Sequence, residues 1–151
     1  MKKICIALDY NPSAEKVAQT GYAYAKALGA ETTLVHVISD AIYYAMDYSP
    51  FMGYESPFNE INFGVVEELK HGAENFLSAS AEHLGSRDIK TAVLEGETAE
   101  AILDYCKEYN IDLLVIGTHS HSVLDNVLMG NSAVRIVRHS EIPLLVVPTK
   151  E

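Results

Sequence analysis

The chain alternates between short, almost continuous apolar runs and longer stretches in which apolar positions recur every three or four residues. The first pattern is typical of strands buried on both faces of a sheet, and the second of amphipathic helices. Strands are predicted at residues 3–8, 32–38, 89–94, 111–116 and 144–147. Helices are predicted at residues 12–28, 65–84, 97–109 and 130–139.

Strands and helices that alternate in this way favour right-handed crossovers, which build a parallel sheet with helices on both faces. We therefore predict an α/β fold, a doubly wound five-stranded parallel sheet with the strand order 3-2-1-4-5. Pro143 and Pro148 flank the last strand and suit a position at the sheet edge. Because the sequence shows no internal repeat and no linker, residues 1–151 are interpreted as one domain.

One segment, residues 40–61, departs from this rhythm. It is rich in aromatic side chains from Tyr43 to Phe58 and contains two prolines and a glycine, without a clean period. A connection of this length inside a compact domain is often functional. We interpret the aromatic segment as a cover over the core or over a dimer surface, with a lid over a ligand as the alternative.

Composition and charge narrow the classes of partner. The 151 residues include 11 Lys and Arg against 21 Asp and Glu, for a formal net charge of −10, which argues against nonspecific binding to nucleic acid or anionic membranes. No apolar run approaches the roughly 20 residues of a membrane helix, and the apolar stretch before Asp9 is too short for a signal peptide. Cys5 and Cys106 are expected to be small buried side chains, so a cytoplasmic location is the default.

The predicted topology also locates a ligand site. In an open doubly wound sheet, ligands bind beyond the carboxyl ends of the strands where the winding reverses, here between the first and fourth strands. Leu8, Asp9 and Tyr10 follow the first strand, and the fourth strand ends at residues 116–119. The helix that opens at residues 130–132 offers free N–H groups and a positive dipole end. This combination predicts an anion-binding crevice.

Several motifs resemble the universal stress protein family. They are Gly117-Thr118-His119-Ser120-His121, Met129-Gly130-Asn131-Ser132, Arg138-His139-Ser140-Glu141-Ile142-Pro143, the opening KKICIALD and Leu34-Val35-His36-Val37. Nucleotide-binding members carry a glycine, two residues, a second glycine, nine residues, and then a glycine followed by Ser or Thr. Gly117 and Gly130 stand at this spacing, whereas Ser120 replaces the second glycine and Asn131 replaces the hydroxyl residue.

The resemblance implies a cytoplasmic stress-response sensor or regulator that binds ATP or AMP, with Mg²⁺ offsetting phosphate charge, and that forms a homodimer through Leu144–Val147. Asp9 would hold the ribose hydroxyls, the backbone near Ala7 and Ile116 would meet the adenine, and the glycine motif would line the phosphates. The complete set of expected binding residues is Ala7, Leu8, Asp9, Thr32, Ile116, Gly117, Thr118, His119, Ser120, Gly130, Asn131, Ser132 and Ala133.

Other interpretations stay open at this point. Ser120 and Asn131 favour an interaction module of the same fold that binds no nucleotide. No residue is assigned a catalytic role, and slow ATP hydrolysis is the most activity expected; a small esterase or phosphatase would rest only on the loop that carries His119, Ser120 and Asp125. His119, His121 and His139 lack the further ligands of a metal site.

Two single residues also have a simpler interpretation. Asp9 directly follows a strand, and its carboxylate can cap the turn that leads into the next helix. His36 lies inside an apolar strand, and we expect it to be a hydrogen-bonded core residue.

Overall fold

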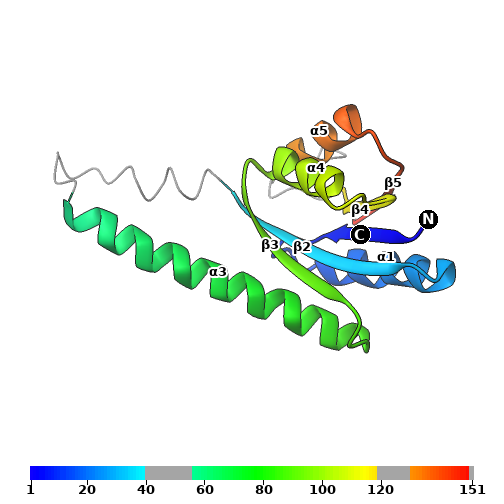
Figure 1. Cartoon of the computed structure of the whole chain (residues 1–151), viewed down its shortest axis with the longest axis horizontal. Helices are drawn as coiled ribbons and strands as arrows, with labels where there is room; N and C mark the ends of the chain where they lie inside the picture. Colours follow the sequence, from blue (N-terminus) through cyan, green and yellow to red (C-terminus); the bar gives the residue numbers. More distant parts are fainter. Residues whose placement is uncertain (40–55, 119–129, 150–151) are drawn as a thin grey trace.

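The computed structural model describes residues 1–39, 56–118 and 130–149, with residues 56–65 described by their backbone alone. Its centre is a five-stranded sheet with the order β3-β2-β1-β4-β5, in which every neighbouring pair is parallel (Figure 1). The predicted fold class and strand order are confirmed. The strands are β1 (Lys3–Ala7), β2 (Glu31–Ser39), β3 (Lys90–Gly96), β4 (Leu113–Gly117) and β5 (Leu144–Val147).

The helices cover both faces of this sheet. One layer consists of α1 (Ala14–Leu28) and α3 (Ser56–Leu84), and the other of α4 (Thr98–Glu108) and α5 (Asn131–His139). In Figure 1, α1 and α3 lie on one side of the strands, and α4 and α5 lie on the other. The sheet therefore winds in opposite senses on the two sides of the β1–β4 pair.

Two helix boundaries differ from the predictions. The helix α3 begins at Ser56, so residues 56–61, predicted to be irregular, are helical. Pro57 fits there because a proline is tolerated in the first turn of a helix. The helix α1 begins at Ala14 and not at Pro12, because Asn11 first closes a turn: its side-chain oxygen accepts from Ser13 N at 3.0 Å, and its carbonyl accepts from Ala14 N at 2.9 Å.

The interior consists of two apolar layers, one on each face of the sheet. Beneath α1 and α3, the side chains of Ile4, Ile6 and Leu34 are fully buried. The opposite layer contains the alternate strand positions and the inward faces of α4 and α5. Gly21 brings α1 close to the sheet, because a Cβ atom there would lie 2.8 Å from Ile6 Cδ1. A larger side chain at this position would strain the core by roughly 1–3 kcal/mol.

Both cysteines lie in the layer beneath α4 and α5. Cys5 on β1 and Cys106 on α4 are buried, unbridged and part of one apolar cluster, as expected from the sequence. Hydrogen bonding to Cys106, together with burial, raises the pKa of the Cys5 thiol. Since the thiolate is the nucleophilic form, Cys5 is an inert packing residue at neutral pH.

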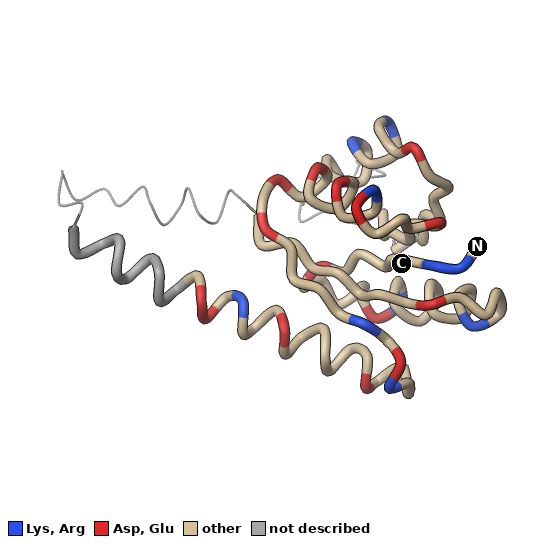
Figure 2. The backbone as a smooth tube through the Cα atoms, viewed as in Figure 1, with Lys and Arg blue, Asp and Glu red and all other residues tan. Residues whose placement is uncertain are grey.

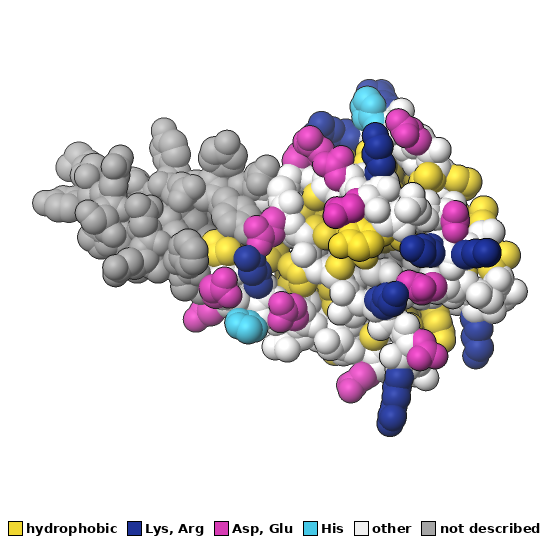
Figure 3. Space-filling model, viewed as in Figure 1, with side chains coloured by type: hydrophobic (Ala, Val, Ile, Leu, Met, Phe, Trp, Pro, Cys, Tyr) yellow, Lys and Arg dark blue, Asp and Glu magenta, His cyan; other side chains and the backbone are white. Residues whose placement is uncertain are grey.

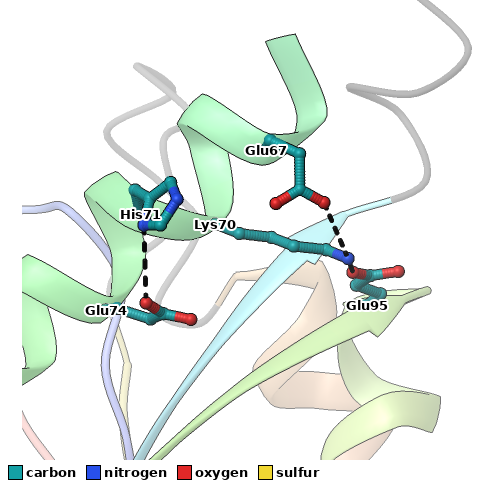
Figure 4. Close-up of polar contacts among 5 residues, drawn as sticks. All are labelled: Glu67, Lys70, His71, Glu74 and Glu95. Carbon is teal, nitrogen blue, oxygen red and sulfur yellow. Dashed lines mark ion pairs between the residues drawn. The ribbon is translucent and has the colours of Figure 1, made fainter. Parts of the chain in front are cut away.

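The surface carries charges of both signs. Lys70 on α3 reaches Glu95 on β3, with Nζ 2.7 Å from Oε1, while Glu67 lies 4.0 Å from the same nitrogen; His71 and Glu74 lie 3.7 Å apart along the helix (Figure 4). These side chains are solvent-exposed, so each pair contributes about 0–1 kcal/mol.

Acidic residues are dispersed along the chain (Figure 2), and on the face drawn in Figure 3 charged side chains alternate with apolar ones. In the described part of the chain, no helix combines the length and the apolar character needed to cross a membrane. Of the aromatic segment from Tyr43 to Phe58, predicted to be a cover or a lid, residues 43–55 lie outside the described residues, and Phe58 is described by its backbone alone, within α3.

Candidate functional site

A cleft of about 460 Å³ opens at the carboxyl ends of β1 and β4, where the winding of the sheet reverses. Its volume falls within the range of about 300–1,000 Å³ that is common for small-molecule sites. Both helical layers contribute to its walls: Val17 comes from α1, Ile102 from α4 and Ile136 from α5. The cleft is therefore apolar inside, with polar groups at the ends of the strands and the starts of the helices.

The structure brings most of the predicted binding residues together in this lining. They are Ala7, Leu8, Asp9, Ile116, Gly117, Gly130, Asn131, Ser132 and Ala133. His119 and Ser120 lie outside the described residues. Thr118 does not line the cleft, but its carbonyl accepts a hydrogen bond from Gly130 N at 3.0 Å.

Thr32 is a correction. It pairs with Ile4 near the beginning of β1, whereas the cleft begins at Ala7, which pairs with Val35. Three residues of strand correspond to roughly 10 Å. Thr32 is therefore buried near the amino-terminal ends of the strands, away from the cleft at their carboxyl ends. The residues that β2 contributes to the cleft are His36, Val37 and Ser39.

Asp9 lies half-buried at the lip of the cleft, immediately after β1. Its Oδ1 atom accepts from Asn11 N at 2.9 Å, which confirms that it caps the turn leading into α1. Among the described residues, its Oδ2 atom has no hydrogen-bond partner. Since a carboxylate can accept several hydrogen bonds, Asp9 can hold the turn and a ligand hydroxyl at once.

The start of α5 contributes further polar groups to the lining of the cleft. Gly130, the N-cap residue, has φ −68° and ψ 160° and supplies no side-chain cap. Its N–H is used by Thr118, and its carbonyl accepts from Val134 N at 3.0 Å. Within the described residues, the N–H groups of Asn131, Ser132 and Ala133 have no acceptor. Free N–H groups at a helix start, with the positive end of the dipole behind them, bind anions.

The start of α4 borders the same cleft through Thr98, and one of its N–H groups is capped. The side chain of Glu97 accepts from Glu100 N at 2.8 Å, so the helix caps itself with a carboxylate. The other oxygen of Glu97 lies 3.1 Å from Nη1 of Arg135 on α5. An anionic ligand would meet a negative charge at α4 and unused donors at α5.

His36 is a lining residue that the sequence interpretation placed only in the core. It is 8% exposed, and its Nδ1 lies 2.8 Å from the carbonyl oxygen of Leu8, which confirms the predicted buried hydrogen bond. Its ring lies 4.3 Å from that of Tyr10, which in turn lies 4.9 Å from the ring of Phe76. Burial lowers the pKa of His36. The ring is therefore neutral at pH 7 and donates to Leu8 from Nδ1.

Other lining residues were missed because their signal is topological. Ser13 and Ala14 reach the cleft from the start of α1, and Thr149 reaches it from beyond β5. Two facts of the topology would have been needed to identify them: α1 begins at the carboxyl end of β1, and β5 lies beside β4. Thr149 in particular follows a strand that was interpreted as a sheet edge and a dimer contact, and not as part of the ligand site.

The minor interpretations gain no support from the described residues. His119, Ser120, His121 and Asp125 lie outside them. His139 is the last residue of α5, at the opposite end from the cleft. Among the described residues, no three His, Cys, Asp or Glu side chains are grouped so that they could hold a metal ion.

Comparison with known proteins places this architecture. The model of the universal stress protein family matches residues 1–148. The chain belongs to the universal stress protein family. A universal stress protein of Methanocaldococcus jannaschii is 30% identical over 153 residues, which span 99% of this chain and 85% of the relative.

Solved members of the universal stress protein family share the fold. One that was crystallised in complex with cAMP has a TM-score of 0.63 at 19% identity, over 99% of this chain and 98% of the other. The structure of the universal stress protein from Archaeoglobus fulgidus in complex with dAMP has a TM-score of 0.61 at 16% identity, over 97% of both chains. At these identities the likeness is one of fold.

Proposed function

We propose that this universal stress protein binds an adenine nucleotide, ATP or AMP, in the cleft between β1 and β4, and acts as a sensor or regulator rather than as a dedicated catalyst. The observation that carries the proposal is the start of α5, which borders the cleft and has no side-chain cap from Gly130. Among the described residues, the N–H groups of Asn131, Ser132 and Ala133 have no acceptor. The family relatives solved with cAMP and dAMP support an adenine nucleotide as the ligand class.

Each part of the nucleotide has a counterpart in the cleft. The apolar wall that includes Ala7, Val37 and Ile116 suits the adenine base, and the free oxygen of Asp9 suits the ribose hydroxyls. The phosphates would lie at the start of α5. Because the net charge of −10 repels a polyphosphate, local donors have to hold it, and Mg²⁺ bound through phosphate oxygens would offset further charge. We expect micromolar or weaker affinity, about −8 kcal/mol at most.

Isothermal titration calorimetry with ATP, AMP and GTP tests the proposal. Asp9→Ala removes charge-assisted bonds to ribose, which are worth roughly 1.5–3 kcal/mol, and should weaken ATP binding about tenfold to a hundredfold. Asp9→Asn is the matched control, since its amide oxygen keeps the bond to Asn11 N without the charge, and its affinity should fall between the two. A wild-type protein that gives no heat with ATP or AMP at millimolar concentration, an order-of-magnitude ceiling, contradicts nucleotide binding.

We also propose that two copies pair through β5. This strand is four residues long, lies at the edge of the sheet and carries Leu144, Leu145 and Val146 half-buried. An apolar edge left bare invites pairing with another chain. Light scattering at tens of micromolar, an order-of-magnitude working range, should give the mass of a dimer, and Leu145→Glu should halve it while circular dichroism stays unchanged. A wild-type monomer at this concentration would contradict the homodimer.

The competing function is an interaction module of the same fold that binds no nucleotide and works through dimerisation and contact with a partner. Ser120 and Asn131, which depart from the nucleotide motif, favour it. A dimer that binds neither ATP nor AMP would identify the protein as such a module. The proposed compartment is the cytoplasm, with which the two unbridged cysteines agree.

A further inference from the structure

Two threonines form a compact hydrogen-bonded unit where β4 and β5 end. Thr118 N donates to the carbonyl of Val147 at 3.2 Å, which continues the pairing of the two strands by one residue. Beyond this, Thr149 N donates to Thr118 Oγ1 at 3.1 Å, and the two hydroxyl oxygens lie 3.2 Å apart. Side-chain bonds therefore hold β4 and β5 together at the point where backbone pairing stops.

The same threonine also holds the start of α5. The carbonyl of Thr118 accepts from Gly130 N at 3.0 Å, and the carbonyl of Gly130 accepts the first hydrogen bond of the helix, from Val134 N. All three polar groups of Thr118 are thus engaged, two with the segment at the end of β5 and one with the start of α5. Thr118 therefore links the end of β4 to the start of α5, in addition to the packing of Ala133 and Ile136 in the core.

The second threonine connects this unit to the cleft. Thr149 is 8% exposed and belongs to the cleft lining. Its methyl group lies 3.1 Å from where a Cβ atom on Gly117 would be, so it packs against the strand end that forms the floor. Without the hydroxyl of Thr118, the buried N–H of Thr149 would lose its acceptor. Because an unpaired buried N–H is costly, we expect the backbone at Thr149 to shift in response.

We propose that Thr118 and Thr149 are positioning residues of the cleft: their hydroxyl groups hold Thr118 against the end of β5. The backbone carbonyl of Thr118 in turn holds Gly130 N, so that the N–H groups of Asn131, Ser132 and Ala133 are already in place for an anionic group of the ligand. The inference rests on the proposed function in taking that group to be the phosphate of a nucleotide. Neither threonine has to touch the phosphate for this role, because preordered donors bind with less loss of freedom.

The test compares Thr118→Val, which keeps the shape and removes the hydroxyl, with Thr118→Ser, which keeps the hydroxyl. Calorimetry is performed with ATP and with adenosine, which has no phosphate. Thr118→Val should weaken ATP binding about threefold to tenfold, as the loss of one hydrogen bond would. Its adenosine affinity should stay at the wild-type value, and Thr118→Ser should bind both ligands as the wild type does. Thr149→Val is a second variant with the same expectation.

Amide hydrogen exchange in the ligand-free protein gives a measurement that does not require nucleotide. The Gly130 and Val134 amides, which donate to the carbonyls of Thr118 and Gly130, should exchange faster in Thr118→Val than in the wild type, with exchange in β1 and α1 unchanged. Equal exchange at these amides in the two proteins overturns the inference whatever the calorimetry gives. An equal loss of ATP and adenosine affinity also overturns it, because it would indicate general destabilisation. Failure of the proposed function is separate: it would be a wild-type protein that binds neither ATP nor AMP.

Discussion

The first turns of α4 and α5 lie in the same helical layer and border the same cleft, yet their N–H groups are used differently. The helix α4 is preceded by Glu97, whose carboxylate accepts from Glu100 N. The helix α5 is preceded by Gly130, which brings no side chain, and the next three N–H groups have no acceptor among the described residues. The residue before each helix therefore determines how far the chain caps the helix start itself: Glu97 caps one N–H group of α4, and Gly130 caps none of α5 with a side chain.

The two starts are also linked electrostatically. Arg135, one turn into α5, lies 3.1 Å from the carboxylate that caps α4. This contact partly neutralises Glu97 beside a cleft that we propose for an anion, within a chain of net charge −10. A single substitution at the start of either helix can remove this difference between α4 and α5.

The largest effect is expected from making α5 resemble α4. Asn131→Asp adds a carboxylate at an exposed position among the free N–H groups. Unit charges of like sign about 4 Å apart repel by about 4 kcal/mol near a protein surface, so ATP affinity should fall by roughly a hundredfold or more. The free energy of unfolding, measured by urea denaturation, should be unchanged or rise by about 0.3–1 kcal/mol, because a negative charge at the start of a helix interacts favourably with the helix dipole.

Asn131→Ala is the control for this substitution, because it removes the side-chain amide without adding charge. Calorimetry with ATP should give an affinity within a few-fold of the wild type. If the aspartate and alanine variants bind ATP equally, the phosphates do not lie at the start of α5.

A smaller effect is expected from making α4 resemble α5. Glu97→Ala removes the cap and should lower the free energy of unfolding by about 1 kcal/mol. Glu97→Gln keeps an acceptor for Glu100 N and should lose less than half of this. Urea denaturation measures both. Each variant also removes a negative charge beside the cleft, so ATP should bind a few-fold more tightly to both than to the wild type; equal stability of the alanine and glutamine variants would contradict the capping role.

The smallest effect is expected at the amino-terminal ends of the strands. There the side chain of Asp112, just before β4, accepts backbone N–H groups at the start of β1, as the side chain of Glu97 does at the start of α4. The Oδ2 atom of Asp112 accepts from the backbone N–H groups of Lys2 and Lys3 at 2.8 and 2.9 Å. These bonds lower the pKa of Asp112. A lowered folded-state pKa gives stability that is present above the unfolded pKa of about 4 and is lost as the pH falls through the folded value.

Asp112→Asn should therefore destabilise the protein at pH 7. The difference from the wild type should begin to shrink near the unfolded pKa of about 4 and vanish only below the lowered folded-state pKa, where the wild-type carboxyl is protonated in both states. Urea midpoints of both proteins, measured across this range, test it. A difference that is constant with pH would show that the charge of Asp112 contributes nothing to stability.

The sequence predicted the sheet well because its signals are local. The runs at Ile4–Ile6 and Leu113–Ile116 are buried on both faces, and such continuous apolar runs are recognisable without any partner. Strand register is not local, and this explains the incorrect placement of Thr32. The sequence of β2 does not say which of its residues lies level with Ala7; only the pairing with β1 does, and it brings His36 to the cleft.

The candidate site was predictable where a strand end is marked by its own residues, as at Asp9 and Gly117. It was not predictable where a distant element completes it. Thr149 carries no motif, and its role follows from hydrogen bonds with Thr118 that form only when β5 lies beside β4. The hydrogen bond from Gly130 N to the Thr118 carbonyl could not be predicted either, because the sequence does not show whether the N–H of a glycine before a helix is bonded within the protein or left free for a ligand.

The central position of β1 in the sheet has a consequence for folding during synthesis. Chains fold as they emerge from the amino end, and β2 and β3 can extend the sheet from β1 as soon as they are made. The cleft needs both flanks of β1, since its walls also come from β4, α5 and Thr149. A ligand that requires this cleft therefore binds only chains that have completed both halves of the sheet. By mass action it raises the stability of those chains alone, by about 2.7 kcal/mol when its concentration is a hundred times its dissociation constant.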